Sequence, residues 1–157
     1  MNVLVTGAAG FIGHHVSLRL LARGDTVIGM DDLNGYYNVA LKHARLARLR
    51  HERFELVQGD ISDATAVARA FAVLGGRVDR VVHLAAQVGV RHSIQHPATY
   101  VRANLVGFSN VIEAARRHSV EHFVYASSSS VYGANTTLPF HESQCTDHPL
   151  SLYAATK

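Results

Sequence analysis

Short runs of β-branched and aliphatic residues recur along the chain and alternate with longer amphipathic segments. The apolar runs cover residues 2–6, 26–30, 53–59, 79–85 and 122–128. The segments between them repeat apolar residues at helical spacing and predict helices over 11–23, 39–51, 63–73 and 98–118, with a last helix beginning near Ser151. The runs are apolar throughout, which is typical of strands covered on both faces. The alternation therefore predicts an α/β fold, a Rossmann-like doubly wound parallel sheet with helices on both faces.

Composition narrows the class of protein. With 157 residues, of which 48% are hydrophobic and 17% charged, residues 1–157 have the size and composition of one soluble globular domain. No apolar stretch approaches the roughly 20 residues of a membrane helix, and the first residues carry no secretory signal pattern. The lone Cys145 cannot form an internal disulfide, which agrees with a reducing compartment. We therefore expect a cytoplasmic protein without a membrane partner.

The net charge of +3 is weak evidence for any partner. The densest basic run is KHARLARLRHER, residues 42–53, in which leucine and alanine interleave with the charges at roughly helical spacing. No aromatic residues accompany these charges, so we interpret the run as one solvated helix face rather than a nucleic-acid surface. We expect no nucleic-acid partner.

A glycine-rich turn follows the first predicted strand and opens the first predicted helix. In VTGAAGFIG, Gly7, Gly10 and Gly13 lie three residues apart. Glycine lets the backbone turn sharply and approach a pyrophosphate closely, while the helix N-terminus offers free N–H groups and a positive dipole end. The alternative is an ordinary tight turn with small residues for packing. The position between strand and helix favours dinucleotide binding.

Carboxylates follow the second and third strands. Asp31 comes 18 residues after Gly13, where a carboxylate can accept hydrogen bonds from an adenosine ribose. A 2′-phosphate would be repelled by Asp31 and Asp32, and no arginine follows directly, so NAD is favoured over NADP. A turn or capping function is the alternative for Asp31. Asp60 can face the adenine or act as a helix N-cap, and the sequence does not decide between these two functions.

Hydroxyl groups gather after the fifth strand. YASSSSVYG places Ser127 to Ser130 at the carboxyl end of that strand, the edge at which open α/β sheets bind ligands. Any one of these serines could instead satisfy loop backbone groups. Tyr153 and Lys157 lie at i and i+4, so on a helix they share one face. This pair is common by chance, and only its position after a dinucleotide turn and a serine run favours a catalytic function.

The segments TGAAGFIG, HLAAQVGVR, NLVGFSN, SSSSVYG and YAATK occur in this order between Val5 and Lys157. Together they resemble the extended short-chain dehydrogenase/reductases of the nucleotide-sugar epimerase and dehydratase group. DDLNGYYNVALKHARL and SLYAATK look most like UDP-glucuronate 4-epimerases, although Asp32 stands where relatives often carry Asn. Dehydratases of the group have an Asp-Glu pair just before VYG, and decarboxylases a Glu, where this chain has Ser129 and Ser130. The missing acid favours epimerisation, with a dehydratase or decarboxylase as the alternative.

The resemblance implies a function for the matching residues. Tyr153 would take the proton from the sugar 4-hydroxyl while the C4 hydride passes to NAD, and Lys157 would hold the nicotinamide ribose and favour the phenolate. Ser128 would hydrogen-bond the 4-oxygen. The 4-keto sugar would then turn and take the hydride back on its other face. The implied substrate is a UDP-sugar, in the first place UDP-glucuronate, and no metal is implied.

The resemblance also implies binding residues. The cofactor-binding set is Gly7, Gly10, Phe11, Ile12, Gly13, Asp31, Asp60, Ile61, Leu84, Ala85, Ala86, Asn104, Tyr153 and Lys157. Ala85 and Ala86 would offer backbone atoms, and Asn104 would brace the strand ends. A glucuronate carboxylate must be held, because the 4-keto intermediate is a β-keto acid that loses carbon dioxide readily. Arg91, Ser129 and Ser130 are the candidates, with a plain surface charge as the alternative for Arg91.

Members of this group continue well beyond the position of Lys157, into a small lobe that grips the nucleotide diphosphate. We therefore expect a Rossmann domain that is truncated before the substrate lobe, binds NAD and does not turn over sugar by itself. A homodimer is expected for full-length members and is doubtful for this chain, because half of the expected helix bundle is missing. A catalytically silent NAD-binding module is the alternative.

Overall fold

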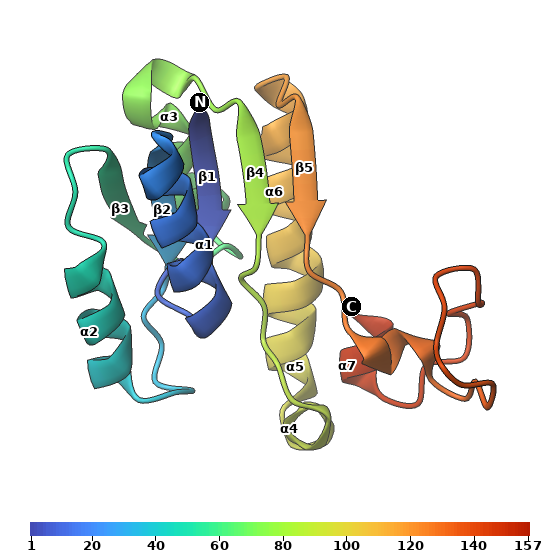
Figure 1. The fold of residues 1–157 in the computed structure, drawn as a ribbon. Helices are drawn as coiled ribbons and strands as arrows, with labels where there is room; N and C mark the ends of the chain where they lie inside the picture. Colours follow the sequence, from blue (N-terminus) through green and yellow to red (C-terminus); the bar gives the residue numbers. More distant parts are fainter.

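All five predicted strands form one parallel sheet. A computed structural model describes residues 1–157. The strands are β1 (Asn2–Thr6), β2 (Thr26–Asp31), β3 (Phe54–Gln58), β4 (Arg80–His83) and β5 (His122–Tyr125). They lie in the order β3-β2-β1-β4-β5, and every neighbouring pair is parallel (Figure 1). This order places β1 at the centre, with the chain crossing to one edge and then to the other, as in Rossmann folds.

Helices cover both faces of the central strands, as expected. On one face, α1 (Phe11–Arg23) and α2 (Val39–Arg48) cover a core that contains Val5, Val27 and Leu49. On the other face lie α3 (Ala64–Ala72) and α6 (Phe108–Arg117), over a larger core that contains Leu4 and Phe71. Figure 1 shows α1 in front of the sheet and α6 behind it. Alternate residues of β1 therefore belong to different cores, which explains why this strand is apolar throughout.

The helix predicted over 98–118 forms, but it is not a uniform α-helix. It consists of α5 (Pro97–Tyr100), a π-helical stretch η2 (Val101–Gly107) and α6 (Phe108–Arg117). The residues at both junctions keep helical backbone angles, so the three parts run as one rod. A π-helical stretch changes which residues face the sheet on either side of it, and such stretches are frequent at functional sites.

The expectation that every strand is covered on both faces is wrong at the edges. In β5, His122, Val124 and Tyr125 are exposed, and in β3, Glu55 and Gln58 are exposed. The reason is geometric, because helices that pack over the centre of a sheet reach its edge strands only in part. Several bounds also differ: β4 and β5 are shorter than predicted, α2 ends at Arg48, and α3 continues into a 3₁₀ turn, η1 (Val73–Gly76).

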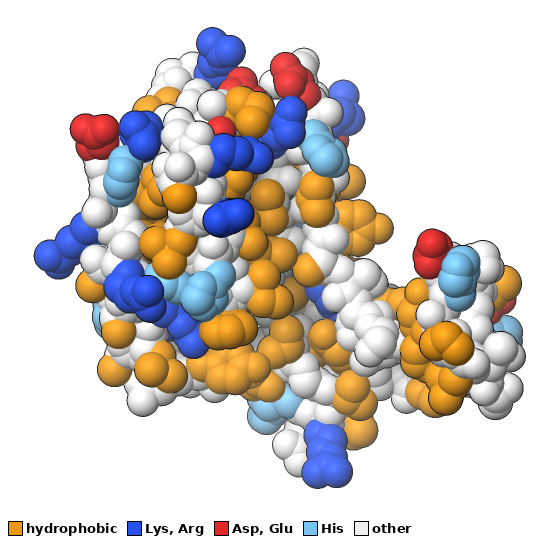
Figure 2. All heavy atoms as spheres, viewed as in Figure 1, with side chains coloured by type: hydrophobic (Ala, Val, Ile, Leu, Met, Phe, Trp, Pro, Cys, Tyr) orange, Lys and Arg blue, Asp and Glu red, His pale blue; other side chains and the backbone are white.

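The part of the chain after β5 lies apart from the sheet. It contains a 3₁₀ turn, η3 (Ser129–Tyr132), a long irregular segment and the one-turn helix α7 (Leu152–Ala155). Figures 1 and 2 show this part as a small lobe beside the end of β5. The helix α4 (Val90–Gln95), which was not predicted, connects the β4 side of the sheet to α5. None of the helices has the length and apolar character needed to cross a bilayer.

Candidate active site

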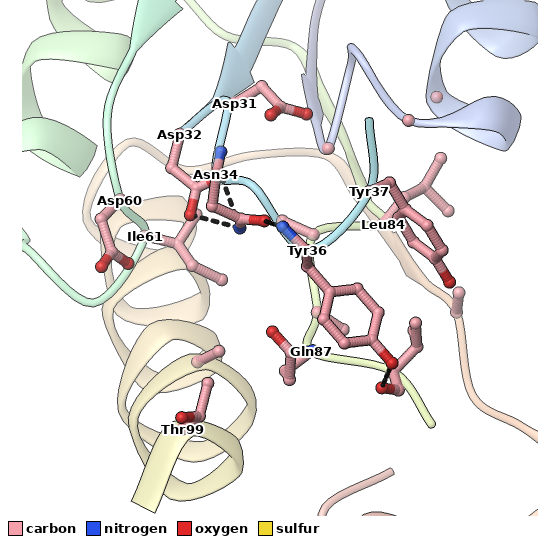
Figure 3. Close-up of a pocket in the computed structure, with 18 of the residues that line it drawn as sticks. Asp31, Asp32, Asn34, Tyr36, Tyr37, Asp60, Ile61, Leu84, Gln87 and Thr99 are labelled. Carbon is pink, nitrogen blue, oxygen red and sulfur yellow. Dashed lines mark hydrogen bonds between the residues drawn. The ribbon is translucent and has the colours of Figure 1, made fainter. Parts of the chain in front are cut away.

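A cavity of about 910 Å³ lies at the carboxyl ends of the strands. Its walls come from the glycine turn and the start of α1, the loops after β2, β3 and β4, residues of α2, α4, α5, η2 and α7, and the start of the serine run. Figure 3 shows Asp31 at the end of β2 and Asp60 on the loop after β3, both at the border of the cavity, with Leu84 and Gln87 on the loop after β4. Since parallel strands end at one edge, residues far apart in sequence meet in this cavity.

The glycine turn is built on close backbone contacts. Gly7 has a φ of +72°, and its N–H donates to the Met30 carbonyl at 2.7 Å. A Cβ on Gly7 would lie 2.9 Å from the Ala85 nitrogen, and a Cβ on Gly13 would lie 2.1 Å from the Gly7 carbonyl oxygen. Both positions therefore require glycine. Gly7, Gly10, Phe11, Ile12 and Gly13 all line the cavity, and their pyrophosphate-binding function stays a prediction.

Asp31 is buried at the end of β2 and accepts hydrogen bonds from three donors. These are the Ala9 N–H at 3.1 Å, the Leu33 N–H at 2.9 Å and the Lys42 ammonium at 3.2 Å. Asp31 thus accepts hydrogen bonds within its own turn and also borders the cavity. The turn function and the ribose-binding function predicted for this residue are therefore compatible. Two of the three donors use Oδ1, so Oδ2 keeps a free lone pair that could accept from a ribose hydroxyl.

Lys42 was not predicted at this site. The basic run was interpreted as a solvated face, but Lys42 is buried, with 6% of its surface exposed, and its ammonium also lies 3.7 Å from Asp32. The signal was present in the spacing, because Lys42, Leu46 and the C-cap residue Leu49 occur at i, i+4 and i+7 on the inward side of α2. The carboxylates that were expected to repel a 2′-phosphate are therefore partly neutralised by a cation from the next helix.

Asp60 lies in the loop after β3, with Ile61 beside it. Its carboxylate accepts from the Ser62 N–H at 2.8 Å and pairs with the Arg102 guanidinium at 2.8 Å. The N-cap of α3 is Asp63, so the alternative that made Asp60 the helix cap is wrong. Asp60, Ile61 and Arg102 line the cavity. Arg102 was not predicted, since it approaches Asp60 from η2, 42 residues away in sequence.

The loop after β4 is held by one threonine. Thr6 Oγ1 accepts hydrogen bonds from the backbone N–H groups of Leu84 and Ala85, both at 3.1 Å, and lies 2.9 Å from His83 Nδ1. A hydroxyl has two lone pairs and one proton, so the Thr6 proton is donated to His83 Nδ1 and the imidazole is neutral, with its own proton on Nε2. Burial, together with the nearby Lys157 ammonium, lowers the pKa of His83 from 6.5 to about 4.

Asn104 connects two parts of the site. Its amide oxygen accepts from the Gln87 N–H at 2.8 Å, and its amide nitrogen donates to the Gln87 carbonyl and to the Thr156 hydroxyl, both at 3.0 Å. The side chain lies on the π-helical stretch and is buried. Asn104 therefore connects the loop after β4 to the end of α7, and both of these segments border the cavity. Leu84, Ala85 and Ala86 line the cavity, whereas Asn104 does not.

Tyr153 and Lys157 both line the cavity. The Tyr153 N–H donates to Ser93 Oγ at 3.3 Å, and Ser151 caps the first turn of α7 by accepting from the Ala154 N–H. The Lys157 ammonium donates to the Ala126 carbonyl, and burial lowers the pKa of Lys157. The structure therefore brings this pair to the same cavity as the glycine turn and Asp31. Ser93, on the unpredicted helix α4, was not expected to contact α7.

The predicted substrate residues lie elsewhere. Of the serine run only Ser127 lines the cavity, and its Oγ donates to the Lys157 carbonyl at 3.1 Å. Ser128 caps η3 by accepting from the Ser130 N–H at 3.2 Å, while Ser129 is exposed. Arg91 is exposed on α4, outside the cavity lining. Ser128 is the N-cap of η3, Ser129 and Ser130 lie within that turn, and none of the three lines the cavity, so their predicted contacts with substrate stay predictions.

Comparison with known proteins identifies the family. Residues 4–157 match the family model described as GDP-mannose 4,6 dehydratase. The chain belongs to this family. Within it, the chain is similar to Protein CapI of Staphylococcus aureus, with 47% identity over 157 residues, and to UDP-glucuronate 4-epimerase 3 of Arabidopsis thaliana, with 50% identity over 157 residues. These matches cover 100% and 99% of this chain, but only 46% and 36% of the two relatives.

Two solved structures of UDP-sugar 4-epimerases are similar to this chain. UDP-glucuronic acid 4-epimerase from Bacillus cereus, in complex with UDP-glucuronic acid and NAD, matches with a TM-score of 0.89 and 34% identity. UDP-glucose 4-epimerase from Thermus thermophilus, in complex with NAD, matches with a TM-score of 0.84 and 35% identity. Each match covers 100% of this chain, and 49% and 47% of the two structures. The chain thus has the fold of one half of these family members.

Proposed function

We propose that this chain is the NAD-binding part of a UDP-sugar 4-epimerase whose substrate is UDP-glucuronate and whose product is UDP-galacturonate. The observation that carries the proposal is the meeting of the glycine turn, Asp31 and the Tyr153–Lys157 pair in one cavity. The similarity to the Bacillus cereus UDP-glucuronic acid 4-epimerase supports the choice of substrate. The serines at 129 and 130 also favour epimerisation, because neither can supply the carboxylic acid that elimination of water would use.

The residues present fit NAD. The turn around Gly7 and Gly13 has no room for a Cβ, which suits close approach of a pyrophosphate, and Oδ2 of Asp31 can accept from the adenosine ribose. Lys157, at the opposite end of the cavity, would hold the nicotinamide ribose. Bound NAD would supply a hydride acceptor that is regenerated within each cycle.

The chain's own residues would move the proton. The phenolate of Tyr153 would accept the proton of the sugar 4-hydroxyl as the hydride leaves C4, and Ser128 would hydrogen-bond the same oxygen. The resulting 4-keto sugar would turn, accept hydride at its other face and take the proton back from Tyr153. The neutral state of His83 matters here, because a protonated imidazole would add a second positive charge near Lys157.

We further propose that residues 1–157 bind NAD without turning over sugar. The relatives are more than twice as long, and Arg91 and Ser128 to Ser130 lie outside the cavity lining, so most sugar contacts would come from residues outside this chain. A homodimer is proposed for longer proteins that carry this segment. The exposed apolar residues Val101, Leu105 and Ile112 on the long helix suit such an interface. A silent NAD-binding module remains the second candidate, favoured by the same placement of the serines.

The test separates cofactor binding from turnover. Titration of the 157-residue chain with NADH, followed by fluorescence, should show binding, and Asp31→Asn should weaken it about tenfold, since a hydrogen bond to a charged group is lost. Asp147→Asn, an exposed aspartate in the small lobe, is the matched control. Failure to bind NADH or NAD would refute the proposal. Formation of UDP-galacturonate from UDP-glucuronate by the 157-residue chain would refute the claim that it lacks turnover.

A further inference from the structure

The glycine turn lies between two loops. In the sheet order, β2 and β4 flank β1, so the loop after β2 (residues 32–38) and the loop after β4 (residues 84–89) lie on either side of the glycine turn. Residues of both loops line the cavity. A dinucleotide whose pyrophosphate rests on the glycine turn would therefore be bordered by both loops.

One side chain joins the two loops. The Tyr36 hydroxyl donates to the Val88 carbonyl at 2.9 Å, across a separation of 52 residues (Figure 3). The other hydrogen bonds of residues 32–38 are local: Asp32 with Asn34, Asn34 with the Tyr36 N–H, and the caps at either end of the loop. Tyr36 thus makes the one hydrogen bond between this loop and a distant part of the chain.

The acceptor of this hydrogen bond is fixed in place. The buried hydroxyl of Tyr100 lies 2.6 Å from the Val88 carbonyl and 2.7 Å from the Gly89 carbonyl, and His92 Nδ1 lies 3.2 Å from the same hydroxyl. Burial raises the pKa of Tyr100, so its hydroxyl stays a donor at neutral pH. The ring of Tyr36 also packs edge-on against His92, with 5.0 Å between centroids. The loop after β4 therefore offers Tyr36 an ordered partner.

The absence of a side chain at Gly89 leaves room for the Tyr36 hydroxyl. Gly89 has a φ of +103°, and a Cβ there would lie 2.7 Å from the Tyr36 hydroxyl oxygen. A side chain at this position would push Tyr36 away from Val88. The sequence thus combines a tyrosine in one loop with a glycine in the other, and the contact depends on both.

We propose that Tyr36 is a latch across the cofactor cleft and sets the rate at which the dinucleotide enters and leaves. The inference rests on the proposed function, since it takes the ligand of the cleft to be NAD. The Tyr36 hydroxyl donates its one proton to the protein, so its removal takes no such bond from the cofactor. Loss of the latch should therefore speed entry and exit together and leave the dissociation constant nearly unchanged.

The experiment compares Tyr36→Phe with Tyr37→Phe in the 157-residue chain. Tyr37 also lines the cavity, and its ring centroid lies 4.8 Å from that of Tyr36, but the Tyr37 hydroxyl makes no hydrogen bond. NADH binding by stopped-flow fluorescence gives the association rate, and displacement of bound NADH by excess NAD gives the dissociation rate. We expect both rates to rise about threefold to tenfold in Tyr36→Phe, as loss of one hydrogen bond predicts, and to stay at the parent values in Tyr37→Phe.

Urea unfolding establishes that each variant is folded. Unchanged rates in Tyr36→Phe, with NADH still bound, would overturn the latch and leave the proposed function intact. Equal acceleration in both variants would also overturn it, because the effect would then belong to the loop as a whole. A faster dissociation alone, with weaker binding, would make Tyr36 a cofactor contact and not a latch. A chain that binds no nicotinamide cofactor would overturn the proposed function and the latch with it.

Discussion

The two ends of the cavity are held in different ways. At the end formed by β1 and β2, the glycine turn and Asp31 are fixed by packed backbone and by cores on both faces of the sheet. At the other end, Tyr153 lies on the one-turn helix α7 and Lys157 lies two residues after it, beside the exposed strand β5. This segment donates hydrogen bonds to Ser93 Oγ and to the Ala126 carbonyl, and it accepts one each from the Asn104 amide and the Ser127 hydroxyl. The end proposed to bind the cofactor, here called the cofactor end, is therefore held by the centre of the fold. The end proposed to carry the catalytic pair, here called the catalytic end, depends on a few side chains.

This difference bears on stability as well as on function. A packed core resists local opening, because any opening exposes apolar surface, whereas a segment tied by a few hydrogen bonds can open at small cost. The cofactor end should therefore lose its structure only when the whole domain unfolds. The catalytic end should open locally, and the predictions below test both statements.

The largest effect is expected at the cofactor end. In Gly13→Ala the new Cβ would lie 2.1 Å from the Gly7 carbonyl oxygen, which is a backbone atom and not the end of a flexible side chain. Helix propensity alone favours alanine by about 1 kcal/mol. We expect the steric clash to outweigh it and to lower the free energy of unfolding by about 4 kcal/mol or more, the range of exceptional substitutions. Urea unfolding measures this.

The matched control for Gly13→Ala is Gly35→Ala. Gly35 lies in the loop after β2, with open space around its Cβ position and no positive φ. Its substitution should leave the free energy of unfolding within about 0.5 kcal/mol of the parent value. Similar losses in both variants would mean that the glycine turn is not specially packed.

The second-largest effect on the free energy of unfolding is expected at His83, which lies between the two ends of the cavity. Its pKa is about 4 in the fold and 6.5 as the ordinary value, so the unfolded chain takes up the proton first as the pH falls. The contribution of the neutral imidazole is full above about pH 6.5 and disappears as the pH falls through about 4. Over that window we expect His83 to account for a loss of about 3 kcal/mol.

Urea unfolding from pH 7 to pH 4.5 checks this contribution, with His83→Gln as the variant. Glutamine can still accept from Thr6 but does not titrate, so its stability should fall less steeply with pH. His122→Gln, on the exposed edge of β5, should keep the parent slope. Some slope should remain in His83→Gln, because burial also lowers the pKa of His14. Parallel curves for the parent and His83→Gln would contradict the assignment.

The smallest effect is expected at the catalytic end. Ser93→Ala removes the acceptor of the Tyr153 N–H, which lies 3.3 Å away. We expect hydrogen exchange at the Tyr153 amide to become about fivefold faster, equivalent to about 1 kcal/mol of local opening, with no change in global unfolding. Ser129→Ala, at an exposed serine outside the cavity, is the control. If the free energy of global unfolding of Ser93→Ala fell by the same amount as the free energy of local opening, α7 would unfold together with the core.

Much of the architecture could be predicted from the chain alone. The five apolar runs became five parallel strands, because a continuous apolar run suits a strand between two helical layers. The glycine turn and Asp31 were predicted correctly as neighbours, since their positions after adjacent strands place them at one edge. Two residues that were missed, Arg102 and Tyr36, reach the cavity from segments 42 and 52 residues from their partners. A local sequence pattern does not predict contacts between residues that are so far apart in the chain.

The sequence by itself determined the strands, the glycine turn and the spacing of Tyr153 and Lys157, because these follow from local backbone geometry and from periodic burial. The tertiary structure decided which polar groups meet. It buried Lys42 against Asp31, placed the Thr6 hydroxyl beside His83 Nδ1, and left Ser128 outside the cavity lining. The physical reason is that hydrogen bonds and charges act over a few ångströms, so their partners are chosen only when the sheet order brings distant segments together.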